Sequence, residues 1–268
     1  MDDLADTLCH YTTADAAFGH IVPSGELRMS PYARMRDRLE NRELPFGGGP
    51  SGDETEAHVK LMDRIVTAIR NVRDATRLLS FTVDAREGYT DSDLPFMRAW
   101  ARARMWEQYA SNHAGICIAF DRERALGHIK ANVHEMGVVS SGEVVYTTRG
   151  FRGTSASTLM LDQFSEDRIA ADVASFVVRH DHDLFFTKTL DCQSEHEFRV
   201  TLMTNVEGEE AEFVHVPFGD AASVRAVILG EQFPEWQFPA AKWACERVGV
   251  PLLTLRWEVG LPWPMPTS

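Results

Sequence analysis

The chain lacks the cysteine spacing of a zinc-binding or disulfide-linked protein. It has four cysteines in 268 residues, and no two of them form a C-x-x-C pair. This absence argues against a zinc knuckle and against a disulfide framework. Reduced thiols are typical of cytoplasmic proteins, so we expect a cytoplasmic location.

Long apolar runs are also missing. The longest ones fall far short of the roughly 18 residues that a membrane-spanning helix needs. The opening residues, Met1-Asp2-Asp3, are acidic and show neither the basic nor the apolar region of a secretory signal. We therefore expect no membrane partner.

Positive charge is scarce. There are 27 Lys and Arg against 40 Asp and Glu, which gives a formal net charge of −13. An acidic surface repels phosphate backbones, and this disfavours a nonspecific nucleic-acid coat protein. Arginines cluster at residues 34–38 and 98–104. A local basic patch is one interpretation of these runs, and a solvated helix face is the simpler one.

Two common phosphate-binding loops are absent. The glycine-rich run at residues 47–52 is not followed by Lys-Ser or Lys-Thr, so it indicates a surface loop. No Gly-x-Gly-x-x-Gly follows a predicted strand, so a Rossmann fold is not indicated. What the chain does have is 44% hydrophobic residues, enough to build a sizeable core.

The hydrophobic pattern predicts helices and strands without strict alternation. Apolar residues recurring every three or four positions, or segments with capping residues, predict helices over residues 14–22, 54–77, 96–109, 121–129, 159–180 and 238–248. Short apolar segments bounded by turn residues predict strands over 8–11, 26–29, 78–83, 115–120, 138–147, 197–203, 213–216, 224–229 and 252–257. The pattern favours an α+β fold with a mixed central sheet, or a split pair of sheets, flanked by helices. We expect one domain over residues 1–260 and a proline-rich tail over 261–268.

Several short motifs occur in a defined order between residues 8 and 230. They are His10-Tyr11-Thr12 with Ser24-Gly25-Glu26-Leu27; Asp37-x-x-Glu40; Ser80-Phe81-Thr82, Met105-Trp106-x-x-Tyr109-Ala110 and His113-x-Gly115-Ile116-Cys117-Ile118-x-Phe120-Asp121; and Lys188, Glu195-x-Glu197-Phe198-Arg199 and Val227-Ile228-Leu229-Gly230. Together they resemble a bacterial family, domain of unknown function 2971. Arg36 and Arg38 stand where that family has Asn and Pro, and Cys192 stands where it usually has Trp. The family name implies no activity.

The same order is similar, more distantly, to ADP-ribosyltransferases of the His-Tyr-Glu type. Those enzymes have a His on a first strand, an aromatic or Ser on a middle strand, and a late Glu-x-Glu. The resemblance implies an ADP-ribosyltransferase-like fold with NAD as the substrate. Glu197 would be the catalytic carboxylate on the ribose, and Glu195 would assist the acceptor. No metal is implied, because nicotinamide is already a good leaving group.

The resemblance also implies NAD-binding residues in the first part of the chain. His10 would hold the adenosine-side ribose, while Tyr11 and Thr12 would contribute backbone contacts. Arg28 or Arg36 would meet the pyrophosphate.

The middle strand and the helix that follows supply the aromatic residue. Phe81 or Tyr109 would stack on the nicotinamide. Side chains alternate along a strand, so Phe81 should face the core if Ser80 and Thr82 face the site.

The chemistry suits a pair of carboxylates. Cleavage of the N-glycosidic bond of NAD develops positive charge on the ribose, and a nearby carboxylate stabilises that charge most in the transition state. Because side chains alternate in an extended strand, Glu195 and Glu197 should lie on one face. One could serve the ribose while the other orients or deprotonates the acceptor.

Each assignment has an ordinary structural alternative. Glu195 and Glu197 could be exposed residues paired with Arg199 or Lys188, and His10 could be a hydrogen-bonded structural histidine. Residues 180–183, His-Asp-His-Asp, are interpreted as a helix end rather than as metal ligands.

Three functions remain open at this point. The first is an NAD-dependent ADP-ribosyltransferase, such as a toxin or phage-defence effector that modifies nucleic acid or protein and is restrained by an antitoxin or another regulatory partner. The second is a non-catalytic ligand-binding or regulatory module of the same fold. The third is a metal-dependent nuclease or hydrolase that uses Glu195, Glu197 and Asp37.

Overall fold

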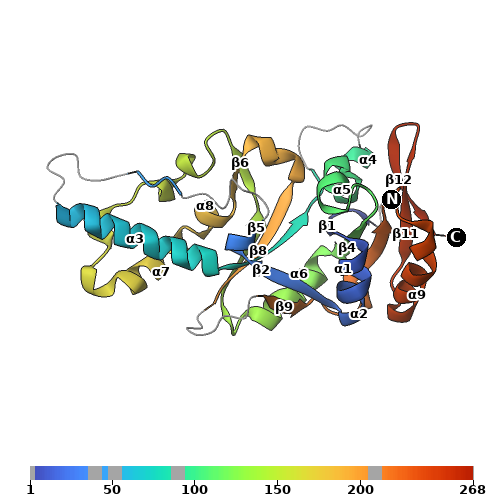
Figure 1. Ribbon diagram of the computed structural model, residues 1–268, viewed down its shortest axis with the longest axis horizontal. Helices are drawn as coiled ribbons and strands as arrows, with labels where there is room; N and C mark the ends of the chain where they lie inside the picture. Colours follow the sequence, from blue (N-terminus) through green and yellow to red (C-terminus); the bar gives the residue numbers. More distant parts are fainter. Residues whose placement is uncertain (1–3, 36–43, 48–55, 86–93, 205–212, 268) are drawn as a thin grey trace.

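The computed structural model describes residues 4–35, 44–47, 56–85, 94–204 and 213–267 (Figure 1). Its larger sheet consists of β1 (Thr7–Thr12), β2 (Glu26–Pro31), β3 (Arg77–Thr82), β4 (Ile116–Asp121), β5 (Gly137–Glu143), β8 (Glu197–Thr204), β9 (Val214–Pro217), β10 (Val224–Leu229), β11 (Leu252–Glu258) and β12 (Leu261–Pro266). Strands β6 (Val145–Thr147) and β7 (Thr187–Thr189) form a small parallel sheet. The predicted α+β class with a mixed sheet is confirmed.

Some helices pack beside the larger sheet, and others lie beyond one end of it. They are α1 (Ala14–Ala16), α2 (Val22–Ser24), α3 (Glu56–Ala75), α4 (Leu94–Met97), α5 (Ala103–Tyr109), α6 (Arg122–Val133), α7 (Ile169–Arg179), α8 (Asp181–Phe185) and α9 (Phe238–Val248). Helices α3, α7 and α8 gather at one end of the molecule, while α9 lies at the other end with β11 and β12 (Figure 1). Among the described residues, no helix has the length and apolar character needed to cross a membrane.

The larger sheet divides around strand β3. The strands follow the order β12-β11-β10-β4-β1-β3-β2-β9, and β8 and β5 continue from β3 on a separate path. One edge of β3 pairs with β8 along its whole length. The other edge is shared, because β1 pairs at Cys9↔Thr82 and β2 pairs nearer the start of β3, at Ser30↔Leu78. Residues 79–81 therefore lie on a stretch of the β3 edge between its two partner strands.

Strand β4 shows why the centre of the sheet reads as a continuous apolar run. Ile116, Ile118 and Phe120 pack into the core on one face, whereas Cys117 and Ala119 pack into a second core on the other face. Because both faces are covered, alternation between apolar and polar residues is not needed.

The predicted helix over residues 96–109 is interrupted. Helix α4 ends at Met97, a 3₁₀ turn covers Ala99–Ala101, and α5 begins at Ala103. Asp84 holds this break from outside, since its Oδ1 accepts from the Ala99 backbone N–H at 2.7 Å and its Oδ2 accepts from Arg98 at 2.8 Å. A hydrogen bond to a residue so distant in sequence is not visible in local periodicity.

Two other predicted elements are shorter than expected. Helix α7 begins only at Ile169, and the residues before it form short 3₁₀ turns in which the Ser165 N–H donates to Asp172. The predicted strand at 138–147 is split at Val144, whose N–H donates to the Glu197 carbonyl, while the next N–H, of Val145, donates to the Phe186 carbonyl. The chain therefore changes partners at this point and leaves the larger sheet.

The C-terminal segment forms a strand where a tail was expected. Strand β12 pairs antiparallel with β11 through all six of its residues. Pro262, Pro264 and Pro266 alternate along β12, and a proline cannot donate to a strand ladder. An edge strand tolerates this pattern, because only the residues between the prolines need to donate to β11.

Gly230, which ends the last motif, occupies a close contact between two backbones. A Cβ atom at this position would lie 2.0 Å from the His113 carbonyl oxygen and 3.1 Å from the Trp106 ring. The Gly230 N–H donates to the Gly115 carbonyl at 3.0 Å. The glycine is therefore explained by packing against the turn that follows α5.

Gly230→Ala is expected to lower the free energy of unfolding by about 1–3 kcal/mol, because the added methyl group must displace backbone. Gly127→Ala is the matched control, since Gly127 is an exposed residue inside α6 with no atom within 4 Å of an added Cβ. We expect the control to stabilise by about 0.5–1 kcal/mol. Urea denaturation of both variants measures this, and equal shifts in the two would contradict it.

Candidate functional site

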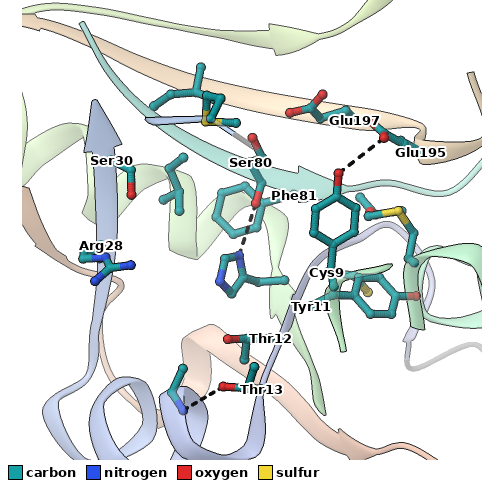
Figure 2. A pocket seen from close by; sticks show the side chains of 18 of the residues that line it. Cys9, Tyr11, Thr12, Thr13, Arg28, Ser30, Ser80, Phe81, Glu195 and Glu197 are labelled. Atoms are coloured by element: carbon teal, nitrogen blue, oxygen red, sulfur yellow. Dashed lines mark hydrogen bonds between the residues drawn. The ribbon is translucent and has the colours of Figure 1, made fainter. Parts of the chain in front are cut away.

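A cavity of about 480 Å³ lies where β1 and β2 flank the edge of β3 (Figure 2). Its lining comes from β1, β2, β3, α5 and the segments around residues 34, 188 and 195–197. Cavities of this size are typical of sites for small molecules and cofactors.

The cavity brings together nine of the ten predicted site residues. The tenth, Arg36, lies outside the described residues. The nine are His10, Tyr11, Thr12, Arg28, Ser80, Phe81, Tyr109, Glu195 and Glu197.

Glu195 and Glu197 reach the cavity by a route that differs from the predicted one. Glu195 ends a 3₁₀ segment, His196 adopts a left-handed conformation with φ of 42°, and β8 begins only at Glu197. Strand alternation was therefore the wrong reason for placing them together. Both side chains are buried, so the alternative of two exposed glutamates is also wrong.

The two carboxylates belong to an ionic cluster formed by Lys188, Glu195, Glu197 and Arg199. The Lys188 ammonium donates to Glu195 at 2.8 Å and to Glu197 at 3.1 Å. The Arg199 guanidinium donates to both Glu197 oxygens, each at 2.8 Å, and also to the Phe185 carbonyl. Arg199 has no exposed surface, and the four formal charges sum to zero.

Opposite effects act on the pKa of Glu197. Burial raises it, but the charges of Arg199 and Lys188, together with the hydrogen bonds from Arg199, lower the pKa to about 2. The carboxylate is therefore ionised at neutral pH. Its backbone N–H donates to the Tyr146 hydroxyl at 2.9 Å, which fixes the start of β8 beside the small sheet.

The His10 side chain links β1 to β3 at the cavity. Its Nδ1 lies 3.2 Å from the Ser80 carbonyl oxygen, and because a carbonyl only accepts, Nδ1 carries the proton. Burial lowers the pKa of His10 below its ordinary value, so the ring is neutral at pH 7. In this tautomer Nε2 is an acceptor, suited to a hydroxyl group.

Of the three aromatic residues predicted here, two are anchored in the core. The Tyr11 hydroxyl donates to the Ala99 carbonyl at 2.6 Å, so its proton is already engaged. Phe81 is 2% exposed and packs edge-on against Phe120. Tyr109 is partly exposed, and its hydroxyl donates to Glu195 at 3.4 Å. The geometry therefore favours Tyr109 over Phe81 for stacking.

The cavity has a cationic side as well. Arg28 on β2 and Arg34 just beyond it both line the cavity, with their guanidinium groups 4.3 and 5.5 Å from the centre of the Phe213 ring. Figure 2 shows Arg28 and Ser30 on one side of the cavity and the Glu195–Glu197 pair on another. A ligand with an anionic part and a polar, cation-forming part would match this arrangement.

Two site residues were missed or undervalued by the sequence reasoning. Lys188 was considered only as a possible ion-pair partner of the two glutamates. It lies in a three-residue strand, which is too short for a hydrophobic pattern to predict. Arg34 belonged to a basic run that was interpreted as a helix face, although the run begins in a 3₁₀ turn beside β2. The position of Lys188 in the motif order was the one available signal.

Residues 105–200 match a protein family of unknown function (DUF2971). This confirms the resemblance over the part of the chain that holds most of α5, all of β4 and all of the ionic cluster. No curated protein and no solved structure matches the chain. Within the DUF2971 region, the motif at residues 113–121 builds the turn and central strand, whereas Lys188 and Glu195-x-Glu197 line the cavity.

The segment His180–Asp183 has a structural role. Asp183 accepts from the Ser155 hydroxyl at 2.8 Å and from the Ala156 N–H at 3.0 Å, and His180 caps the end of α7. The described residues include no group of three or more His, Cys, Asp or Glu side chains placed to hold a metal ion.

Proposed function

We propose that the chain is an ADP-ribosyltransferase-like protein that binds NAD in this cavity. One observation carries the proposal: His10, Arg28 and the Glu195–Glu197 pair, which are far apart in sequence, line a single cavity of about 480 Å³. That volume is appropriate for a dinucleotide partly open to solvent.

Each part of the site has a matching part of NAD. Arg28 and Arg34 supply positive charge for the pyrophosphate. The neutral His10 accepts from a ribose hydroxyl, and the Tyr109 ring offers a face for nicotinamide. The carboxylates stand where positive charge develops on the ribose as nicotinamide leaves.

The biological setting is part of the same proposal. We place the protein in the cytoplasm as a toxin or phage-defence effector whose acceptor is a nucleic acid or a protein. An antitoxin or another regulatory partner would restrain it.

A non-catalytic binding module is a second candidate, and the ionic cluster favours it. Both carboxylates contact a buried cation, so the site can bind a ligand as an electrically balanced pocket without promoting its cleavage. This candidate predicts NAD binding with no nicotinamide release. The metal-dependent alternative relied on Asp37, which lies outside the described residues.

The test is calorimetric binding of NAD combined with chromatographic detection of nicotinamide. His10→Ala is expected to weaken binding about tenfold, the effect of losing roughly one hydrogen bond of 1–1.5 kcal/mol. His134→Ala is the matched control, because His134 is an exposed histidine at the end of α6. Wild-type protein that neither binds NAD nor releases nicotinamide would contradict the proposal.

The binding should also depend on pH through His10. Since the His10 pKa is lowered by burial, the acceptor nitrogen stays unprotonated at neutral pH. Affinity should therefore hold at pH 7 and decrease only as the pH falls below the ordinary histidine range. His10→Ala should remove that decrease.

A further inference from the structure

We propose that the two carboxylates have separate tasks: Glu197 holds the ionic cluster in place, and Glu195 is the carboxylate that contacts the substrate ribose. This assignment rests on the proposed function and reverses the order expected from the motif. It follows from the hydrogen bonds and ion pairs that each carboxylate would lose on binding a ligand.

Glu197 is committed to Arg199. Both of its oxygens accept from the guanidinium at 2.8 Å in a bidentate arrangement, and Oε2 also accepts from Lys188 at 3.1 Å. Arg199 is fully buried, so turning Glu197 toward a ligand would break a bidentate ion pair with a guanidinium inside the protein. A neutral ribose hydroxyl cannot compensate for that loss. Glu197 is therefore a positioning residue.

Glu195 differs, because one of its hydrogen-bond partners is neutral. One oxygen accepts from the neutral Tyr109 hydroxyl at 3.4 Å, a long hydrogen bond, and the other accepts from Lys188 at 2.8 Å. A ribose hydroxyl can replace the Tyr109 hydroxyl at little cost, because one neutral donor substitutes for another. The same exchange would release Tyr109 to pack on the nicotinamide ring.

The backbone supports this division. Glu197 is paired with Thr82 in the β3–β8 ladder, which fixes its position in the sheet. Glu195 precedes the left-handed His196 and lies outside the ladder, on a turn that projects it beside Tyr109. Lys188 contacts both carboxylates and holds Glu195 against the cavity wall.

The reaction that tests the assignment uses water as the acceptor. The bond between the ribose C1′ and the nicotinamide nitrogen breaks, and its electron pair stays on nicotinamide. Water adds to C1′, and one proton is released to solvent. Glu195 stabilises the positive charge on the ribose between these events.

The experiment compares Glu195→Gln with Glu197→Gln by steady-state nicotinamide release, NAD calorimetry and thermal melting. Glu195→Gln is expected to lower kcat about 100-fold with KM nearly unchanged, and to lower the melting temperature less than Glu197→Gln does, because Lys188 keeps Glu197 as its counter-ion. Glu197→Gln should lower the melting temperature and reduce kcat by no more than about tenfold, measured where the protein is folded. Glu246→Gln, on the exposed side of α9, is the control.

A second variant guards against simple unfolding. Glu197→Leu combined with Arg199→Met removes one buried ion pair as a unit; it should fold and release nicotinamide with a kcat within about tenfold of the wild-type value. A Glu195→Gln protein with wild-type kcat, or a folded double variant with no activity, would overturn the assignment while leaving the proposed function intact. Wild-type protein without nicotinamide release would overturn the assignment, and absence of NAD binding as well would overturn the proposed function with it.

Discussion

Arg199→Met is expected to lower the free energy of unfolding by about 3–5 kcal/mol, the usual cost of removing one partner from a buried ion pair. The guanidinium has no exposed surface and donates to both oxygens of Glu197 and to the Phe185 carbonyl. Without it, Glu197 keeps only the Lys188 ammonium, which also serves Glu195. Urea denaturation monitored by tryptophan fluorescence would measure the change.

Two controls separate this effect from a general loss of an arginine. Arg225→Met removes an ion pair of 2.6 Å to Asp121 in which the Arg225 side chain is 50% exposed. Screened pairs of that kind contribute under about 1 kcal/mol. The Glu197→Leu/Arg199→Met double variant should recover most of the lost stability, since both partners of the buried pair are replaced by apolar side chains. A cost for Arg199→Met no larger than that for Arg225→Met would show that the cluster is not a buried ion pair in solution.

Acid is expected to destabilise the protein through Glu197. Its folded-state pKa of about 2 lies below its ordinary value of 4.5, because Arg199 and Lys188 outweigh burial. The unfolded chain therefore takes up the proton first as the pH falls. The contribution, about 3 kcal/mol for a shift of this size, is present above about pH 4.5 and is lost as the pH falls toward 2.

Acid also protonates other carboxylates, so the effect of Glu197 is measured as a difference between two proteins. Unfolding free energies at pH 6, 4 and 3 would be compared between wild type and the Glu197→Leu/Arg199→Met variant. The wild-type curve should fall more steeply with acid than the variant curve. Parallel curves would contradict a lowered Glu197 pKa.

Local pattern predicted most of the elements and failed where a distant contact decides the structure. The β4 strand and the Asp121 cap of α6 depend on nearby residues, and both agree with expectation. The break between α4 and α5 depends on Asp84, which precedes Ala99 by 15 residues in the sequence. The split between β5 and β6 likewise depends on two carbonyls supplied by residues 186 and 197.

For the site, too, the sequence predicted which residues come together but not their burial or contacts. Motif order identified residues that the cavity does bring together, including His10 and Glu197. It could not reveal that Arg199, interpreted as a possible surface partner, has no exposed surface, because burial depends on residues distant in sequence, such as Phe185. Nor could it show that the Tyr11 hydroxyl donates to the Ala99 carbonyl while the Tyr109 hydroxyl donates to Glu195.

The alternating prolines of β12 have a consequence for how molecules meet. The residues that donate to β11 lie between them, so the three prolines present the opposite edge of the strand. That edge offers carbonyl oxygens without matching N–H groups at Pro262, Pro264 and Pro266. A strand from another molecule would find acceptors but no donors along it, so the larger sheet resists lengthening by intermolecular pairing at this boundary.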